Sequence, residues 1–327
     1  MQIIEAEQVH RVLRFEELIP AIQAAFEGTF GAPRRNVYPL DEGASHGDAF
    51  AVLPVWTDRA IAVKAFTYFP SNPERGHERL HSKILMFDRA TGVPTAVVNG
   101  TSVTFWRTAA VSAAAADHLA PTGARVLLVC GTGNLAPYMA AAHMSVRPIE
   151  RVGVWGRDPE RARRTCEQIR ARRPDVAVDV VDDLRSATGE ADLISCATGS
   201  PQPLIFGDWV RPGTHIDLVG NHERTQRECD SDLVVRARVF VDSRANVMNE
   251  AGEILLPIAE DRIGEDHVLA ELSELCRGVH PGRVSEAEVT LFKSVGTALS
   301  DLVGAQLVMD KLREHASGAD VEAPPAR

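Results

Sequence analysis

Apolar and polar positions change their spacing along the chain, and the central part has the most regular pattern. Between residues 125 and 241, short apolar runs alternate with segments of helical character. The apolar runs predict strands at Val126–Cys130, Arg151–Trp155, Val176–Val181, Leu193–Ala197, Thr214–Val219 and Arg238–Val241. Strands that alternate with helices are typical of a doubly wound parallel sheet, so we predict an α/β, Rossmann-type fold for this region.

The pattern before this region is different. Apolar residues from Phe15 to Phe26 recur at steps of three and four, which predicts an amphipathic helix. An alanine-rich segment, Phe105–Leu119, predicts a second helix that leads into the central region. Between the two helices, alternating segments predict a mostly antiparallel sheet with strands at Ala49–Val55, Ile61–Tyr68, Lys83–Asp88 and Pro94–Asn99.

The last apolar pattern of the chain predicts a long helix. The helical period continues through Ala298, Leu302, Ala305, Met309 and Leu312. We expect this helix to pack on the N-terminal region. The polar stretch His315–Arg327, with its pair of prolines, is expected to be disordered.

One apolar strand ends in a glycine-rich turn. After Val126–Cys130 the sequence is Gly-x-Gly-x-x-Ala, with Gly131, Gly133 and Ala136, and a helical segment follows. In a dinucleotide-binding unit the first glycine permits a tight turn, the second lets the backbone approach a pyrophosphate, and the small third residue lets the helix pack on the strand. The helix N-terminus offers N–H groups to the anion. The alternative is a turn without a ligand, but the surrounding strand–helix alternation favours a nucleotide site.

The residues after the second strand of this region bear on which dinucleotide binds. An NAD site usually has an acidic residue there to hold the ribose hydroxyls, whereas this chain has Gly156-Arg157-Asp158, with Arg161 one turn into the next helix. Arginine suits the additional phosphate of NADP, so we predict NADPH as the cofactor in preference to NADH. In the alternative interpretation Arg157 is solvated and Asp158 caps the helix, and both interpretations can hold together.

Two cationic residues are candidates for binding an anion. Lys64 lies within the predicted strand Ile61–Tyr68, between Val63 and Ala65, and a buried lysine requires an anion nearby. The alternative for Lys64 is an edge or solvent-facing position. Arg107 lies at the predicted start of the alanine-rich helix, where its charge and the free N–H groups would attract an anion together.

Composition and charge narrow the class of protein. The 327 residues carry a net charge of −10 at pH 7, which argues against nucleic acid or an anionic membrane as a partner. No apolar run has the length of a membrane span, and Met1–Val12 lacks the apolar core of a signal peptide, so we expect a cytoplasmic protein. The cysteines stand singly, without metal-ligand spacing. We predict neither zinc nor disulfides, and core positions for Cys130 and Cys196.

Two segments after predicted strands are expected to face the ligands. They are 197–201 and 220–223, and each follows a strand of the predicted parallel sheet. Ligands of doubly wound sheets bind beyond the carboxyl ends of the strands. We therefore expect these segments to lie near the cofactor and its reaction partner.

A series of motifs resembles the ornithine cyclodeaminase and mu-crystallin family. Phe105-Trp106-Arg107-Thr108-Ala109-Ala110 follows Asp88-Arg89-Ala90-Thr91-Gly92 and precedes the glycine turn, and the likeness continues to Lys293-Ser294-Val295-Gly296, over nearly the whole chain. The resemblance implies a homodimeric, NAD(P)-dependent enzyme acting on α-amino or α-imino acids. It also implies a dimerisation and substrate domain, α+β in class, made of residues 1–118 and 299–327 around a Rossmann domain of residues 119–298.

The resemblance implies roles for individual residues. Lys64 and Arg107 match the family's ligands of the substrate carboxylate, and Arg35 matches the third, although Arg34 is adjacent. The cofactor is expected to contact the glycine turn, the strand ends and the segment before the last helix: Thr108, Gly131, Thr132, Gly133, Asn134, Leu135, Arg157, Arg161, Ala197, Thr198, Val219, Ser294, Val295 and Gly296.

One position departs from the cyclodeaminases. They and the related alanine dehydrogenases carry an aspartate two residues after the glycine of the Val-Gly turn, where this chain has His222. The ordinary pKa of histidine suits donation of a proton to an imine near neutral pH. The alternative is that His222 is an exposed loop residue and that water protonates the imine. The sequence is more similar to the imine-reductase branch of the family.

We therefore predict an NADPH-dependent reductase that converts a cyclic imine 2-carboxylate, a ketimine, to an L-amino acid such as proline or pipecolate. Lys64, Arg107 and His222 are the predicted catalytic residues, and Arg35, Lys64 and Arg107 are predicted to bind the substrate. Two other functions stay open. One is an amino-acid dehydrogenase or cyclodeaminase that works in the oxidative direction, and the other is a non-catalytic protein that binds NADPH and a small ligand.

Overall fold

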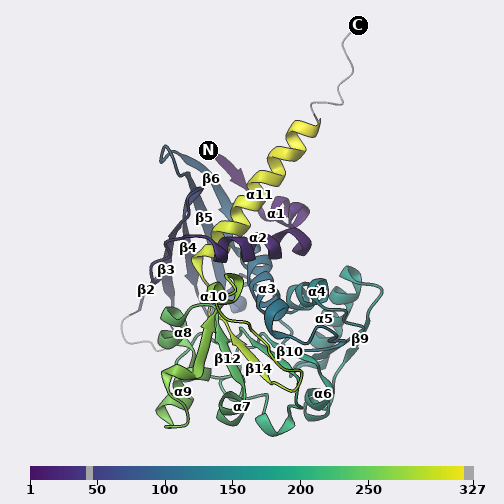
Figure 1. Cartoon of the computed structure of the whole chain (residues 1–327). Helices are drawn as coiled ribbons and strands as arrows, with labels where there is room; N and C mark the ends of the chain where they lie inside the picture. Colours follow the sequence, from purple (N-terminus) through teal and green to yellow (C-terminus); the bar gives the residue numbers. More distant parts are fainter. Residues whose placement is uncertain (42–46, 320–327) are drawn as a thin grey trace. The chain divides into compact units, whose positions relative to one another are not determined.

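The structure is a computed structural model that describes residues 1–41 and 47–319, and the chain divides into two compact units (Figure 1). One unit contains Met1–Arg107 and Ala298–Arg327, and the other contains Thr108–Thr297. The break falls inside helix α3 (Gly100–Leu119), earlier than the boundary at residue 118 that the sequence predicts. Each unit has its own β-sheet. The assignment of cofactor and substrate to separate domains stays a prediction.

The unit Thr108–Thr297 is built on a sheet in the order β13-β12-β14-β11-β10-β7-β8-β9. Every neighbouring pair in this sheet is parallel. The strands are β7 (Val126–Cys130), β8 (Arg151–Trp155), β9 (Ala177–Val180), β10 (Leu193–Cys196), β11 (His215–Leu218), β12 (Arg238–Val241), β13 (Val268–Glu271) and β14 (Thr290–Lys293). The predicted Rossmann-type α/β fold is confirmed. Strands β13 and β14 are additions to the prediction.

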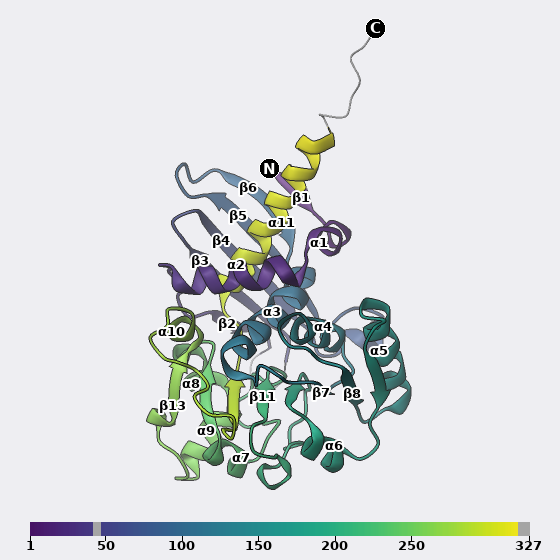
Figure 2. The same cartoon turned by 45° about the vertical axis from the view of Figure 1, so that its right-hand side comes forward.

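Side chains along β7 alternate between two hydrophobic clusters, one on each face of the parallel sheet. Leu127 and Val129 belong to one cluster, and Leu128 and Cys130 belong to the other. Cys130 and Cys196 are buried free thiols, as predicted. The first cluster includes residues of α4 (Ala136–Val146) and α5 (Pro159–Arg172), which Figure 2 shows together, and the second includes residues of α6 (Leu184–Glu190), α7 (Ser231–Arg236), α8 (Arg244–Glu250) and α9 (Gly252–Ala259). Both faces are therefore buried, as a parallel sheet requires. Helix α10 (Leu272–Cys276) follows β13.

The strand order reverses between β7 and β10. From β7 the chain continues to β8 and β9 on one side, and then returns to β10 on the other side. The ends of the two strands are joined, since the Ala197 N–H donates to the Cys130 carbonyl at 2.8 Å. In doubly wound sheets ligands bind at such a reversal, outside the carboxyl ends of the strands. The glycine turn and the segment 197–201 both follow strands at this point.

The other unit contains a six-stranded sheet in the order β1-β6-β5-β4-β3-β2. Its strands are antiparallel except for β1, which pairs with β6 in parallel. They are β1 (Gln2–Ile4), β2 (Asn36–Pro39), β3 (Ala49–Trp56), β4 (Ala60–Tyr68), β5 (Leu80–Asp88) and β6 (Pro94–Asn99). The prediction of a mostly antiparallel sheet is confirmed, and β1 and β2 are additions to it.

Helices cover one face of this sheet. Helix α11 (Ala298–Ala319) packs against α2 (Phe15–Glu27), contacts α1 (Ala6–Val12) and lies along β3, β4 and β5 (Figures 1 and 2). The apolar stripe of α2 is buried, as its period predicts. The predicted disorder from residue 315 is wrong for residues 315–319, which continue α11, and the remainder of that tail lies outside the described residues. Over residues 1–41 and 47–319, no helix has the length and apolar character needed to cross a membrane.

Candidate active site

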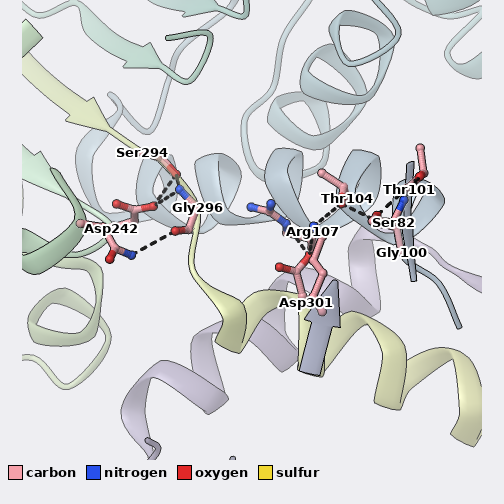
Figure 3. A network of polar contacts seen from close by, with 11 residues as sticks. Ser82, Gly100, Thr101, Thr104, Arg107, Asp242, Ser294, Gly296 and Asp301 are labelled. Atoms are coloured by element: carbon pink, nitrogen blue, oxygen red, sulfur yellow. Dashed lines mark hydrogen bonds and ion pairs between the residues drawn. The ribbon is translucent and has the colours of Figure 1, made fainter. Parts of the chain in front are cut away.

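Two cations share one carboxylate oxygen in the unit that contains β4 and α11. Lys64 Nζ donates to Asp301 Oδ1 at 2.9 Å, and Arg107 Nε donates to the same oxygen at 3.0 Å. Lys64 Nζ also donates to Thr104 Oγ1 at 2.6 Å. The exposed fraction of the side chain is 4% for Lys64, 2% for Asp301 and 11% for Arg107. Figure 3 shows Arg107 on α3 with its Nε edge toward Asp301 on α11.

The local structure explains why these side chains meet. Strand β4 lies inside the sheet, between β5 and β3, and Lys64 shares its buried face with Ala60 and Ala62. Thr104 and Arg107 are three residues apart on α3, so they project from the same side of the helix. Asp301 lies in the first turn of α11. The edge or solvent-facing position considered for Lys64 is therefore wrong.

The predicted position of Arg107 at a helix start is also wrong. Helix α3 begins at Gly100, about two turns before Arg107. The side chain of Asn99 accepts from the Ser102 N–H at 2.9 Å near this start. The first helical residues, Gly100 to Thr104, have low helix propensity, which conceals the helix start in the sequence. An anion at Arg107 would therefore meet the guanidinium group alone, without the N–H groups of a helix N-terminus.

Asp301 is a site residue that the sequence analysis missed. It lies three residues after Ala298 and four before Ala305, so it falls on the apolar stripe of α11. A carboxylate at a buried position of such a stripe requires a cation or several hydrogen bonds. A charged residue at an apolar position of the helical repeat is therefore the signal in the sequence that identifies Asp301 as a candidate.

Burial lowers the pKa of Lys64 from an ordinary 10.5 to about 8. Loss of hydration is the largest cause, Asp301 opposes it, and the charges of Arg107 and Arg35 lower the pKa further. Arg35 precedes β2 and is half-buried, whereas Arg34 is exposed, so Arg35 is the better match for a third substrate ligand. Cations outnumber carboxylates in this group of residues, and the surplus positive charge favours an anionic ligand.

Part of the donor capacity of this group is unused by the protein. Among the described residues, Lys64 Nζ has two acceptors for its three N–H groups, and Arg107 donates through Nε alone. The outer edge of a guanidinium group matches the two oxygens of a carboxylate. The geometry is therefore suitable for binding a small carboxylate.

In the other unit, the glycine turn after β7 has the form of an anion site. Gly131 has a φ of +130°, and a Cβ there would lie 2.6 Å from the Ala197 carbonyl oxygen, so no other residue fits. A Cβ on Gly133 would meet nothing within 4 Å, which leaves the backbone open to a ligand. Helix α4 starts after Leu135 without a side-chain cap, and Ala136 is buried at its first turn. An uncapped helix N-terminus behind an open glycine backbone suits a phosphate.

Strand β8 ends beside this turn. Gly156 packs so closely that a Cβ there would lie 2.4 Å from Thr132 Cγ2. Asp158 accepts from two backbone N–H groups of α5, at 2.9 and 3.3 Å, so its predicted role as a helix cap is confirmed. Arg157 and Arg161 are exposed at the end of β8 and the start of α5. Their guanidinium groups are therefore accessible to a ligand.

A buried carboxylate joins the two loops that follow β10 and β11. Glu228 Oε1 accepts from the Thr198 N–H at 2.7 Å and from Thr198 Oγ1 at 2.8 Å, and Glu228 Oε2 accepts from the Gly220 N–H at 2.8 Å. A Cβ on Gly220 would lie 2.0 Å from the Thr198 carbonyl oxygen. The two loops are therefore in direct contact, and Glu228 holds them together.

The environment of Glu228 is charged and dry. Glu228, Glu253 and Lys293 are all fully buried, and Lys293 Nζ forms an ion pair with Glu253 at 2.9 Å while donating to the Asn221 carbonyl at 2.8 Å. Burial raises the pKa of Glu228 to about 7, with Lys293 opposing the rise and Glu253 adding to it. This role of Glu228 could not be predicted from the sequence, because Arg227-Glu228-Cys229-Asp230 has the composition of a solvated loop.

A second carboxylate holds the segment that is predicted to lie near the nicotinamide. Asp242 Oδ2 accepts from Ser294 Oγ at 2.7 Å, from the Val295 N–H at 3.1 Å and from the Gly296 N–H at 2.6 Å (Figure 3). Asn246 Nδ2 donates to the Gly296 carbonyl at 3.2 Å. Gly296 has a φ of +88°, which glycine adopts without strain. The turn after β14 is thus fixed from both sides.

Three further predicted site residues lie at the end of β11, on the loop after it and on α3. Val219 is buried at the end of β11, and His222 is exposed on the loop that follows. Thr108 is half-buried in α3, next to Arg107. The structure therefore groups Arg35, Lys64 and Arg107 in one unit, and it places every other predicted site residue in the other unit.

The fold and the site together define a class of protein. One unit has the doubly wound sheet of a dinucleotide-binding domain, and the other contains a buried pair of cations that fits a small carboxylate. A family model described as the ornithine cyclodeaminase/mu-crystallin family matches residues 1–316. The chain belongs to this family.

Individual relatives agree with that assignment. The chain is 47% identical over 317 residues to the Delta(1)-pyrroline-2-carboxylate reductase of Colwellia psychrerythraea, a match that covers 96% of this chain and 100% of that protein. It is 32% identical over 317 residues to the ketimine reductase mu-crystallin of Mus musculus, covering 94% and 96%. The solved structure of Thermococcus litoralis Delta(1)-pyrroline-2-carboxylate reductase in complex with NADH and L-proline is similar with a TM-score of 0.92 and 33% identity, covering 97% of this chain and 98% of that one.

Proposed function

We propose that this protein is an NADPH-dependent reductase that converts a cyclic imine 2-carboxylate to an L-amino acid such as proline. The observation that carries the proposal is the buried pair Lys64 and Arg107, which has unused donors for a carboxylate. The relatives named for Delta(1)-pyrroline-2-carboxylate and for ketimines support the reaction class. L-Proline bound to the Thermococcus litoralis enzyme supports the proposed product, and the NADH bound there supports a nicotinamide cofactor.

In this proposal the substrate carboxylate binds to Lys64 and Arg107, with Arg35 as a third cation. The contacts are charge-assisted hydrogen bonds in a dry environment, and each contributes roughly 1.5–3 kcal/mol. A fixed carboxylate also fixes the adjacent imine carbon, because the two carbons are directly bonded. Positioning is therefore the main contribution of these residues to the rate.

The residues of the other unit suit a bound dinucleotide. The open backbone at Gly133 and the uncapped start of α4 would hold the pyrophosphate, and Arg157 with Arg161 would hold the 2′-phosphate of NADPH. The segment from Ser294 to Gly296, fixed by Asp242, and the loop of Thr198, fixed by Glu228, would form the remaining contacts. The bound cofactor supplies the hydride that the imine carbon accepts.

Reduction of an imine also requires a proton on the nitrogen. His222, exposed on the loop after β11, is the proposed donor, because an imidazole gives a proton readily near neutral pH. The His222→Ala variant is expected to reduce the imine more slowly and to have a changed pH profile of kcat. An unchanged profile would assign the proton to water and would leave the reductase function standing.

We also propose that the enzyme is a homodimer, and the face of the six-stranded sheet opposite α11 supports this. Residues that alternate with the buried ones are apolar there as well, including Val52, Ile61, Val63, Leu85 and Phe87, and they are half-buried. An antiparallel sheet with one face in water usually has polar residues on that face. A second copy of the chain would cover this apolar outer face.

The test of the function is a direct assay. Purified protein is mixed with NADPH and a panel of Δ1-pyrroline-2-carboxylate, its six-membered homologue, 2-keto acids and ornithine, and oxidation of NADPH and release of ammonia are followed. We expect oxidation with the cyclic imino acids and no ammonia from ornithine with NAD or NADP. Robust ammonia release from ornithine would overturn the proposal.

A matched pair of variants links the activity to the cation pair. Arg107→Ala is expected to lower kcat/KM about tenfold to a few hundredfold, because it removes one charge-assisted contact, with the affinity for NADPH nearly unchanged. Lys83→Ala is the control, since this lysine on β5 is half exposed and pairs with Glu5 at the surface. Equal kinetics in the two variants would remove Arg107 from the substrate site.

A further inference from the structure

The two carboxylate oxygens of Asp301 are bonded in a way that is unusual for a structural ion pair. One oxygen, Oδ1, accepts from both Lys64 and Arg107, and the other oxygen, Oδ2, is buried and has no hydrogen-bond partner among the described residues. A structural carboxylate would satisfy both oxygens, because an unsatisfied buried acceptor is costly. Apolar side chains would often fill such a buried volume with equal or greater stability. The position of Asp301 is therefore explained better by its effect on Lys64 and Arg107 than by a contribution to stability.

The shared oxygen determines where the cations point. Asp301 and Thr104 together take two of the three N–H groups of Lys64, which leaves one direction for a ligand. Arg107 is held by its Nε, so the outer edge of its guanidinium group is left for a ligand. Because both cations donate to the same oxygen of Asp301, they lie close together, and a single carboxylate could accept from the free donors of both.

The same carboxylate has an electrostatic effect on Lys64. The charged groups that act on this lysine are Asp301 from α11, Arg107 from α3 and Arg35 from the segment before β2, and of these three charges only Asp301 favours the charged form of Lys64. Burial also disfavours that form. Without the charge of Asp301, the lysine would lose its proton at a lower pH.

We propose that Asp301 is the positioning residue of the substrate site, which orients Lys64 and Arg107 toward one carboxylate and keeps Lys64 charged. This inference rests on the proposed function for the identity of the substrate, a cyclic imino acid. Asp301 does not touch the reacting atoms in this role. It acts through the two cations, so its effect depends on the charge of Asp301 and on the pH.

The experiment measures binding of pyrrole-2-carboxylate, a planar ring carboxylate whose nitrogen is not basic, so that only groups of the protein titrate above pH 5.5. Calorimetry in the presence of NADPH gives the Kd from pH 5.5 to pH 10. In the unmodified protein binding should weaken as the pH rises through about 8, where Lys64 loses its proton. In Asp301→Asn the shape of the side chain is kept and the charge is lost. Binding should then weaken from a pH about one to three units lower.

The expected result at pH 7 is an affinity for pyrrole-2-carboxylate that is about twofold to a hundredfold lower in Asp301→Asn, because a pKa of Lys64 that is one to three units lower leaves less of the lysine charged, with recovery toward the unmodified value at pH 5.5. Asp310→Asn is the matched control, because this residue lies on the same helix, is about one-third exposed and contacts Gln306 and Arg313. The control should keep the Kd profile of the unmodified protein. A loss in Asp301→Asn that is equal at every pH would make Asp301 a structural residue and would overturn the proposal.

A second variant separates charge from position. Asp301→Glu keeps the charge but moves the shared oxygen, so the pH at which binding weakens should stay near 8 while the affinity falls at every pH. An unchanged affinity in this variant would contradict the positioning role, whether or not Asp301→Asn folds. If the unmodified protein binds pyrrole-2-carboxylate with this Asp301-dependent profile but reduces no cyclic imino acid, the proposed function fails and the role of Asp301 stands.

Discussion

Buried ionisable side chains lie at the centre of the polar clusters in both units. Lys64, Asp301, Glu228 and Asp242 are buried or nearly so, and each meets an opposite charge or several N–H donors. Taking such a group out of water costs several kcal/mol, and its partners largely offset that cost. Removing one partner leaves the other uncompensated, so substitutions at these positions should affect function more than their contacts alone suggest.

The exposed arginine at the end of β8 is expected to select the cofactor. Arg157 offers a cation to a 2′-phosphate, and neighbouring Gly156 offers no acid to the ribose hydroxyls. Arg157→Asp should therefore reverse or abolish a preference for NADPH, measured as the ratio of kcat/KM for NADPH and NADH with the same imino acid. Arg164→Asp, at an exposed position of α5, is the control for charge alone. Efficient use of NADH by the unmodified protein would rule out the assignment.

At the scale of elements, the structure depends on loops that are held by buried side chains. The loops after β10 and β11 each contribute backbone N–H groups to Glu228, and the turn after β14 contributes its own to Asp242. Loops normally are the mobile part of a fold. Here Glu228 fixes the loops after β10 and β11, and Asp242 fixes the turn after β14. The ends of these strands can therefore present a preorganised surface to a ligand.

Glu228→Gln tests the connection between the loops after β10 and β11. An amide has one acceptor oxygen, so at least one of the three hydrogen bonds that Glu228 accepts is lost. We expect the Kd for the cofactor to rise about tenfold, since loss of one buried hydrogen bond costs roughly 1–1.5 kcal/mol. Glu223→Gln, on the exposed loop nearby, is the control. Equal cofactor affinity in both variants would contradict the role of Glu228.

The same variant has a predicted effect on stability. Burial raises the pKa of Glu228 from 4.5 to about 7, so the native state takes up a proton between these values that the unfolded chain does not. The free energy of unfolding should therefore gain up to about 1.4 kcal/mol per pH unit from this group as the pH falls from 7 toward 5. Glu228→Gln should lack this gain. Denaturant unfolding at several pH values measures the difference, and parallel curves for both proteins would refute it.

At the scale of the whole molecule, the proposed homodimer depends on one sheet face. Val63→Glu would place a charge in the centre of the apolar outer face of the six-stranded sheet. We expect the mass in solution to fall from twice 35.5 kDa to 35.5 kDa, as measured by light scattering. Thr67→Glu, at the same face but near the end of β4, is the control. A monomeric unmodified protein would reject the homodimer.

Local patterns were sufficient for much of this fold. The alternation of apolar strands and helices predicts the Rossmann-type sheet, because strands buried on both faces must be continuous apolar runs. The turn at Gly131 was predictable too, since its backbone conformation and the nearness of the Ala197 carbonyl admit only glycine. The start of α3 could not be predicted in this way. Weak helix formers precede Arg107, and they are helical because of packing in the folded protein.

The features of this protein that can be predicted from its sequence are therefore local, namely the period of each element, the glycine turn, and the presence of Lys64 in an apolar strand. The pairings between distant side chains depend on the folded structure. Lys64 and Asp301 are 237 residues apart, and Glu228 reaches Thr198 across 30 residues. Such distant groups meet only when a sheet register and a helix packing bring them together. A buried charge is stable only at that meeting point, so its partner is chosen by the fold as a whole.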